Sequence, residues 1–322
     1  MKEKSNRKLL TSSQVAGLLA VHTSTVKRWC DEGVLISEKT EGGHRRIRLS
    51  NALETARSQD IQTYLDLFHP WEVNVWLAVS EVEDHGSYGR LQNLALSWLS
   101  DGRTDLLGRL LFEVGSRPSV PFSQFLDEGV RTFMMRVGAE WQGGRLAVGE
   151  EHMASQVVLE TLLRLRPGWD HPMTSGPSTD GFLQVAVVGA LEGDHHDLGA
   201  QAVRVLLEKE GWRVYYLGAD VPLEDFAEIQ RAHGASLVCV SLSPQSRLPD
   251  VQRAVRVLGE FYRPEYPYAL GLGGSLGTIS EEMVPEGPFE TQSISRSAQE
   301  FLNWVRTLKT EDGDSQDPRR VA

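Results

Sequence analysis

The stretch that decides the fold is residues 183–199, which read LQVAVVGALEGDHHDLG. Its first half, residues 183–190, is a short apolar run typical of a buried strand, and glycine and charged residues then form a loop. A helix pattern follows over residues 200–210. The alternation continues downstream, with strands expected at residues 214–217, 236–242 and 268–272 and a helix at 223–233. Strands that alternate with helices predict a doubly wound, Rossmann-like parallel sheet over residues 182–308.

The loop at the end of the first strand carries side chains suited to binding a metal. In open α/β sheets, ligands bind at the carboxyl ends of the strands. His196 stands there, with Asp194 two residues before it and Gly199 three residues after it. A carboxylate in that place fixes the tautomer of a ligating imidazole, and a glycine lets the backbone pass close to a bulky group. His195 is a competing ligand, and a solvated polar loop is the alternative without any ligand.

Small residues at wider spacing complete a known pattern. Two serines stand at the end of the strand at 236–242, and a glycine pair ends the next strand. The whole resembles the cobalamin-binding fingerprint D-x-H-x-x-G…S-x-L…G-G of methionine synthase, corrinoid mutases and corrinoid regulators, with serine where its leucine is usual. The resemblance implies a corrinoid whose own base has left the cobalt, with His196 as the lower axial ligand and Asp194 behind it. It also implies a slot for the nucleotide tail, lined by Gly199, Ser241, Ser243, Gly273 and Gly274.

The region before this sheet reads as helical. Apolar residues recur every three or four positions from Phe122 to Trp141, and similar stripes elsewhere in residues 60–172 predict a four-helix bundle. Trp141 is followed, after nine residues, by Glu151 and His152. This W-x9-E-H spacing resembles the helical cap of corrinoid light sensors, the CarH group of the MerR family.

The resemblance implies a role for each member of that spacing. Trp141 would pack over the upper face of the corrin, Glu151 would contact its adenosyl group, and His152 would be the candidate upper cobalt ligand after photolysis. The alternatives from the residues alone are a core tryptophan and a structural histidine, and Glu150 is a neighbour that the spacing distinguishes from Glu151. A corner at Gly143–Gly144 would bring these side chains to one end of the bundle.

The N-terminal residues 1–58 predict a helix-turn-helix followed by a β-hairpin wing. Thr11 and Gln14 form a capping box, Thr23 can cap the second helix, and Gly33 can end it. The segment resembles the winged helix-turn-helix of MerR proteins, which implies operator DNA as a partner. Predicted contacts are Ser24 and Thr25 with base edges, and Lys27, Arg28, His44, Arg45, Arg46 and Arg48 mainly with phosphates.

The distribution of charge along the chain supports a separate function for its N-terminal part. The 322-residue chain has a net charge of −11, yet residues 1–50 carry ten Lys and Arg against five Asp and Glu. A basic segment at residues 1–50 in an otherwise acidic chain favours a polyanionic partner for that segment alone. No apolar run is long enough to span a membrane and no secretory signal is found, so neither a membrane partner nor export is expected. Two distant cysteines, Cys30 and Cys239, fit a reducing cytoplasm.

These observations predict a multidomain α and α/β chain. Its parts are a DNA-binding domain (1–58), a helical cap (60–172), a linker (173–181), a cobalamin-binding α/β domain (182–308) and a flexible tail (309–322). The resemblance, which extends over nearly the whole chain, implies a transcriptional repressor rather than an enzyme. It would use adenosylcobalamin as its chromophore, bind its operator in the dark as a homotetramer, and release it in light.

Three other functions stay open from the sequence. A corrinoid methyltransferase or mutase subunit would share the sheet and parts of the cap, but it would not need a basic winged head. A regulator that senses cobalamin without photochemistry would ignore light. A regulator with a vestigial corrin site would bind no cofactor.

Overall fold

The computed structural model describes residues 9–167, 184–243, 246–274 and 279–314, without the side chains of residues 309–314. The predicted linker at 173–181 lies outside these residues. The chain divides into two compact units, Met1–Leu94 and Ala95–Ala322. The division falls inside a helix rather than at residue 59, where the sequence analysis places the end of the DNA-binding domain.

The first unit contains a small antiparallel sheet and several helices. Strands β1 (Leu9–Leu10), β2 (Ser37–Lys39) and β3 (Arg45–Arg48) pair in the order β1-β3-β2. The helices are α1 (Ser12–Leu18), α2 (Thr23–Asp31), α3 (Leu49–Ser58), a 3-10 helix (Tyr64–Phe68), α4 (Glu72–His85) and the first half of α5 (Gly89–Ser100). Helix α4 buries side chains around most of its circumference, among them Val75, Trp76 and Leu77, which explains why it belongs to a compact unit with its neighbours.

Local capping fixes the first two helices. The capping box at α1 is confirmed, since Thr11 Oγ1 accepts the Gln14 N–H at 3.2 Å and Gln14 Oε1 accepts the Thr11 N–H at 2.9 Å. The expected cap of α2 is wrong by one residue. His22, not Thr23, caps this helix, because its Nδ1 accepts the Ser24 N–H at 3.2 Å. Gly33 follows the helix with φ of 75°, as a helix-ending glycine requires.

The second unit begins with antiparallel helices. These are the end of α5, α6 (Thr104–Gly115), a continuous helix from α7 (Phe122–Gln124) through a π-helical turn (Phe125–Arg131) to α8 (Thr132–Gln142), and α9 (Val148–Arg164). The predicted stripe is buried at Leu126, Val130, Phe133 and Val137. Helix α9 packs against α6 and α8, which buries its apolar side.

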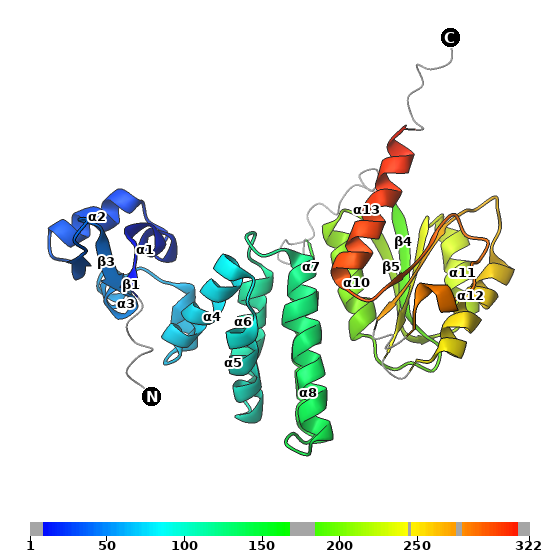
Figure 1. Ribbon diagram of the computed structural model, residues 1–322, viewed down its shortest axis with the longest axis horizontal. Helices are drawn as coiled ribbons and strands as arrows, with labels where there is room; N and C mark the ends of the chain where they lie inside the picture. The colour runs from blue at the N-terminus through cyan, green and yellow to red at the C-terminus, as the bar shows by residue number, and fades with distance from the viewer. Residues whose placement is uncertain (1–8, 168–183, 244–245, 275–278, 315–322) are drawn as a thin grey trace, which may run out of the picture. The chain divides into compact units, whose positions relative to one another are not determined.

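A five-stranded parallel sheet completes this unit. Its strands are β4 (Val185–Leu191), β5 (Arg213–Val221), β6 (Leu237–Leu242), β7 (Ala269–Gly274) and β8 (Gln292–Ser295), in the order β5-β4-β6-β7-β8. Figure 1 shows α10 (Leu198–Lys209) and α13 (Ala298–Asp314) beside one face, and α11 (Leu223–His233) and α12 (Leu248–Phe261) beside the other. The predicted doubly wound sheet is confirmed. The tail expected from residue 309 is wrong in its boundary, because α13 continues to Asp314.

Within the described residues, no helix is long and apolar enough to cross a bilayer.

Candidate functional site

The strand order places the predicted loop at a crevice of the sheet. From β4 the chain goes to β5 on one side of it and then to β6 on its other side. The strand order therefore reverses between β4 and β6, which flank the topological switch point. Ligands of open α/β sheets bind outside the carboxyl ends of such strands. The register pairs Ala190 with Ser241 and Ser241 with Gly273, so the predicted loop, serines and glycines share one edge.

Asp194 organises the loop that carries His196. Its carboxylate is buried, with Oδ1 accepting the His196 N–H at 3.0 Å and Oδ2 accepting the Ser243 N–H at 2.8 Å. Oδ1 also lies 3.2 Å from His196 Nδ1. A carboxylate can only accept in this pair, so in the neutral ring Nδ1 carries the proton and Nε2 keeps its lone pair. The His196 side chain is 61% exposed, which leaves Nε2 accessible to a metal.

A second aspartate, Asp220, fixes the same loop from β5. Asp220 Oδ1 accepts the Gly193 N–H at 2.7 Å, and the Asp220 N–H donates to Asp194 O at 2.9 Å. Asp220 has φ of 54°, a left-handed conformation that is uncommon outside glycine. Local spacing does not reveal this residue, because it lies 26 positions from Asp194. Its place at the carboxyl end of a neighbouring strand is the signal that points to it.

The glycines lie where a side chain would collide with the sheet. A Cβ at Gly199 would stand 2.6 Å from Ser241 Oγ, and one at Gly274 would stand 2.0 Å from Leu242 O. Gly274 also has φ of 132°, so any larger residue there is strained. Ser241 and Ser243 are buried beside them. Close backbone approach with small side chains is what a slot for an extended group requires.

A second carboxylate–imidazole pair stands on α9. His152 Nδ1 lies 2.7 Å from Glu151 Oε2, and Ser155 Oγ donates to Glu151 Oε1 at 3.0 Å. The His152 side chain is 73% exposed, so its Nε2 is also accessible. Glu150 is used differently, since its carboxylate accepts the Ala147 N–H at 2.7 Å and caps the helix. The structure thus separates Glu151 from its neighbour by its hydrogen bonds.

Trp141 shares one end of the α8–α9 hairpin with this pair. It is the penultimate residue of α8, and Glu151 lies in the first turn of α9, after a connection that turns at Gly144 with φ of 71°. Trp141 is 44% exposed, whereas Val137 of the same stripe is fully buried. The core alternative for Trp141 is therefore wrong, because the stripe leaves the interior before it.

The predicted DNA contacts in the first unit divide into two groups. Ion pairs with carboxylates of the same unit engage three arginines, namely Arg28 with Glu32, Arg45 with Asp31 and Arg48 with Glu38. Lys27 and His44 are exposed, and Thr25 is half-buried. Ser24 Oγ lies 2.7 Å from His22 Nδ1, so the cap of α2 engages this hydroxyl.

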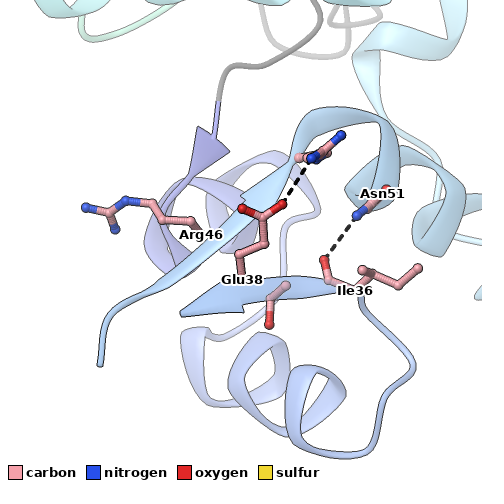
Figure 2. A pocket seen from close by; sticks show the side chains of 6 residues that line it. Ile36, Glu38, Arg46 and Asn51 are labelled. Carbon is pink, nitrogen blue, oxygen red and sulfur yellow. Dashed lines mark hydrogen bonds and ion pairs between the residues drawn. The ribbon is translucent and has the colours of Figure 1, made fainter. Parts of the chain in front are cut away.

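A hollow of about 270 Å³ lies on the same unit between β2, β3 and the start of α3. Figure 2 shows Glu38 within it, and Asn51 donating from α3 to Ile36 O at 3.2 Å. Arg46 extends outward from β3, away from Glu38. The hairpin is thereby tied to α3, while Arg46 Nη1 donates to Arg45 O at 3.3 Å and, among the described residues of this unit, pairs with no carboxylate.

Comparison with known families gives the ligand class. Residues 184–287 match a family model described as a B12 binding domain, and residues 91–166 match a second model of the same description. The chain is a cobalamin-binding protein. The residues present fit this cofactor, since an accessible imidazole backed by a buried carboxylate lies beside a floor of glycines and serines.

Two curated relatives illustrate the range of this similarity. Dimethylamine corrinoid protein 3 of Methanosarcina acetivorans is 28% identical over 145 residues, which are 45% of this chain and 65% of that protein. The HTH-type transcriptional repressor CarA of Myxococcus xanthus is 32% identical over 142 residues, which are 41% of this chain and 42% of that protein. The chain thus spans less than two thirds of the length of either relative.

One solved structure shares the fold of about two thirds of this chain. The monomethylamine corrinoid protein of Methanosarcina barkeri superposes with a TM-score of 0.50 at 18% identity, covering 66% of this chain and 96% of that one. This likeness supports a helical cap joined to a Rossmann-like B12-binding domain.

Proposed function

We propose that this protein is a light-responsive transcriptional repressor of the CarH type, which binds adenosylcobalamin and has no catalytic activity. The observation that carries the proposal is the combination of a cobalamin-binding unit with a basic helix pair and hairpin in one chain. The similarity of 41% of this chain to a transcriptional repressor of Myxococcus xanthus supports a regulatory function.

The chain's own residues have distinct tasks at the cofactor. His196 would bind the cobalt through Nε2, while Asp194 and Asp220 keep its loop in place. Trp141 and Glu151 would contact the adenosyl group of the bound cofactor, so their contacts would depend on whether that group is present. Bound adenosylcobalamin supplies a cobalt–carbon bond that visible light cleaves. His152 would be a second imidazole able to bind the cobalt once that bond is cleaved, since Glu151 holds its ring by Nδ1 and the side chain is exposed.

DNA binding belongs to the first unit in this proposal. The exposed Lys27 and the outward Arg46 contact phosphates, and Thr25 near the start of α2 reaches a base edge. Arg45 and Arg48 serve mainly to fix the hairpin, because each is paired with a carboxylate of its own unit. Phosphate contacts make affinity salt-dependent without specifying sequence.

Release in light requires a change of assembly. We expect a homotetramer in the dark. Several weakly binding N-terminal units joined in one oligomer bind a multi-site operator far more tightly than one unit alone. The adenosyl group shifts the equilibrium toward this oligomer only if it binds the assembled form more tightly than the dissociated form.

A corrinoid methyl-carrier subunit is the second candidate function. Its support is the similarity to the dimethylamine corrinoid protein of Methanosarcina acetivorans. A carrier needs neither a basic hairpin nor specific DNA. A regulator that binds cobalamin without photochemistry is distinguished by its indifference to light.

The test begins by selecting DNA from a random-sequence pool with the full chain and adenosylcobalamin in darkness. The selected DNA is then used in gel shifts before and after green light. The proposal expects a shift in darkness that illumination abolishes, while a chain loaded with methylcobalamin serves as the comparison. Equal binding before and after light would refute light control, and failure to enrich any sequence would favour the carrier. A His152→Ala chain should still release DNA in light but give a different photoproduct spectrum.

A further inference from the structure

One buried side chain in the helical part of the second unit bonds to an element 171 residues away. Asp127 Oδ1 accepts the Ala298 N–H at 2.8 Å, and Asp127 Oδ2 accepts the Gln299 N–H at 3.1 Å. These are the first two amides of α13, which no bond inside that helix can satisfy. A carboxylate at a helix N-terminus also interacts favourably with the helix dipole.

The unusual backbone at Asp127 accounts for this reach. Asp127 lies in the π-helical turn, where the Thr132 N–H donates to Asp127 O five residues earlier. The Thr132 hydroxyl donates to the same oxygen at 2.9 Å. Such turns are rare, and they frequently mark functional positions. Here the turn presents to the sheet domain a carboxylate that lies buried.

Further bonds to the sheet domain lie near the end of the α8–α9 hairpin that is closer to Asp127. Arg166, just after α9, donates to both oxygens of Glu208 on α10, at 2.7 and 2.8 Å. Ser123 Oγ, four residues before Asp127, donates to Gln299 Oε1 at 2.7 Å. The hairpin is therefore tied to the sheet domain at its base, while Trp141 and His152 stand at its opposite end, the tip.

A small rotation at the base of the hairpin becomes a large displacement at its tip, because the tip lies far from the base along the helix. Trp141 lies 14 residues beyond Asp127 in a continuous helix, which is about 20 Å at 1.5 Å per residue. With this arm, a rotation of roughly 10° about the base moves the tip by about 3.5 Å. That displacement is comparable to the difference between a ligand in contact with a metal and one that is not.

We propose that Asp127 is a positioning residue, which sets by its bonds to α13 where Trp141 and His152 stand relative to His196. The inference rests on the proposed roles of Trp141 and His152, but its first consequence requires no cofactor. Loss of the carboxylate removes two of the bonds that fix the base of the hairpin and leaves those of Arg166 and Ser123, so the tip samples a wider range of positions.

The test measures this range by pulsed electron spin resonance on the full chain. Spin labels are placed at Val148→Cys on the tip and Tyr266→Cys on the sheet domain, both exposed sites, in a Cys30→Ser chain whose remaining Cys239 is buried. The parent should give one narrow distance distribution, and Asp127→Ala should at least double its width. Asp127→Asn, which retains one acceptor, should broaden it less, and it keeps the test available if the alanine variant does not fold. Glu160→Ala, which removes an exposed carboxylate from α9, should leave the width unchanged.

A second readout uses hydroxocobalamin. His152→Ala should change the absorption spectrum of the corrinoid bound to the parent, and the change should be smaller in an Asp127→Ala chain, which still binds through His196. A distribution as narrow in Asp127→Ala and Asp127→Asn as in the parent overturns the inference, and so does an undiminished effect of His152→Ala in the Asp127→Ala chain. If the parent binds no corrinoid, the proposed function fails, while the width measurement still decides the role of Asp127.

Discussion

Replacing Asp194 by asparagine tests the loop that presents His196. Each carboxylate oxygen accepts one backbone N–H, from His196 and from Ser243, at 3.0 and 2.8 Å. An amide group has only one oxygen, so its NH2 must face one of these two donors. A buried donor left without an acceptor costs about 1–3 kcal/mol.

Two magnitudes follow for Asp194→Asn. The free energy of unfolding should fall by about 2 kcal/mol, which for a unit of this size lowers Tm by about 4–8 °C. Corrinoid affinity should fall by about 10–100-fold, as when the carboxylate behind a ligating imidazole is lost. Thermal unfolding of the cofactor-free chain, followed by circular dichroism, measures the first. Titration with hydroxocobalamin measures the second.

Asp197→Asn is the matched control on the same loop. Asp197 uses one oxygen, which accepts the Tyr216 hydroxyl at 2.8 Å, and an asparagine oxygen can replace it. This variant should melt within about 1 °C of the parent, since no hydrogen bond is lost. The reasoning is refuted if Asp194→Asn also melts within this range and binds hydroxocobalamin within twofold of the parent.

Three further changes have expected outcomes. Gly199→Ala should weaken hydroxocobalamin binding at least tenfold, because its Cβ would stand 2.6 Å from Ser241 Oγ, and adding Ser241→Ala should restore part of the affinity by opening that space. Lys27→Ala should lower affinity for the selected DNA and reduce the slope of log K against log salt by about 1, as for one lost phosphate contact. Burial raises the pKa of Tyr216 and of Tyr268. Unfolding releases these protons once pH exceeds about 10, so stability should fall as pH rises above that value, and less steeply in Tyr268→Phe.

Each of these expectations has a result that contradicts it. Close packing of Gly199 against Ser241 does not matter for binding if Gly199→Ala binds hydroxocobalamin as tightly as the parent does. The same holds if Gly199→Ala with Ser241→Ala binds no more tightly than Gly199→Ala alone. Lys27 contacts no phosphate if its loss leaves the salt slope unchanged. Thermal melting between pH 9 and 12 tests the tyrosines, and a Tm that stays constant above pH 10 contradicts their contribution.

Local spacing was sufficient to predict much of the sheet domain and its loop. Asp194, His196 and Gly199 lie within six residues, and the rule for parallel strands brings Ser241 and Gly273 to the same edge. The β4 strand was recognisable because its residues are apolar and bounded by glycine. Strand β8 was missed, since Gln292–Ser295 is short and mostly polar and depends on pairing with β7.

Residues that act over long sequence separations escaped prediction. Asp220 reaches the loop only through the pairing of β5 with β4, and Asp127 reaches α13 only through the fold of the whole unit. The cap of α2 was misplaced for a different reason. A histidine is an unusual cap, and its bond to the Ser24 amide depends on side-chain orientation rather than residue type.

The bond between Asp127 and the start of α13 has a consequence for how such a chain recombines. The last described helix of the sheet domain is satisfied by a side chain from the helices that precede the sheet, so neither part is a complete module alone. Gene shuffling that exchanged one without the other would expose two helix amides and a carboxylate together. We therefore expect these two parts to be inherited together, whereas the N-terminal unit, Met1–Leu94, takes no part in that bond.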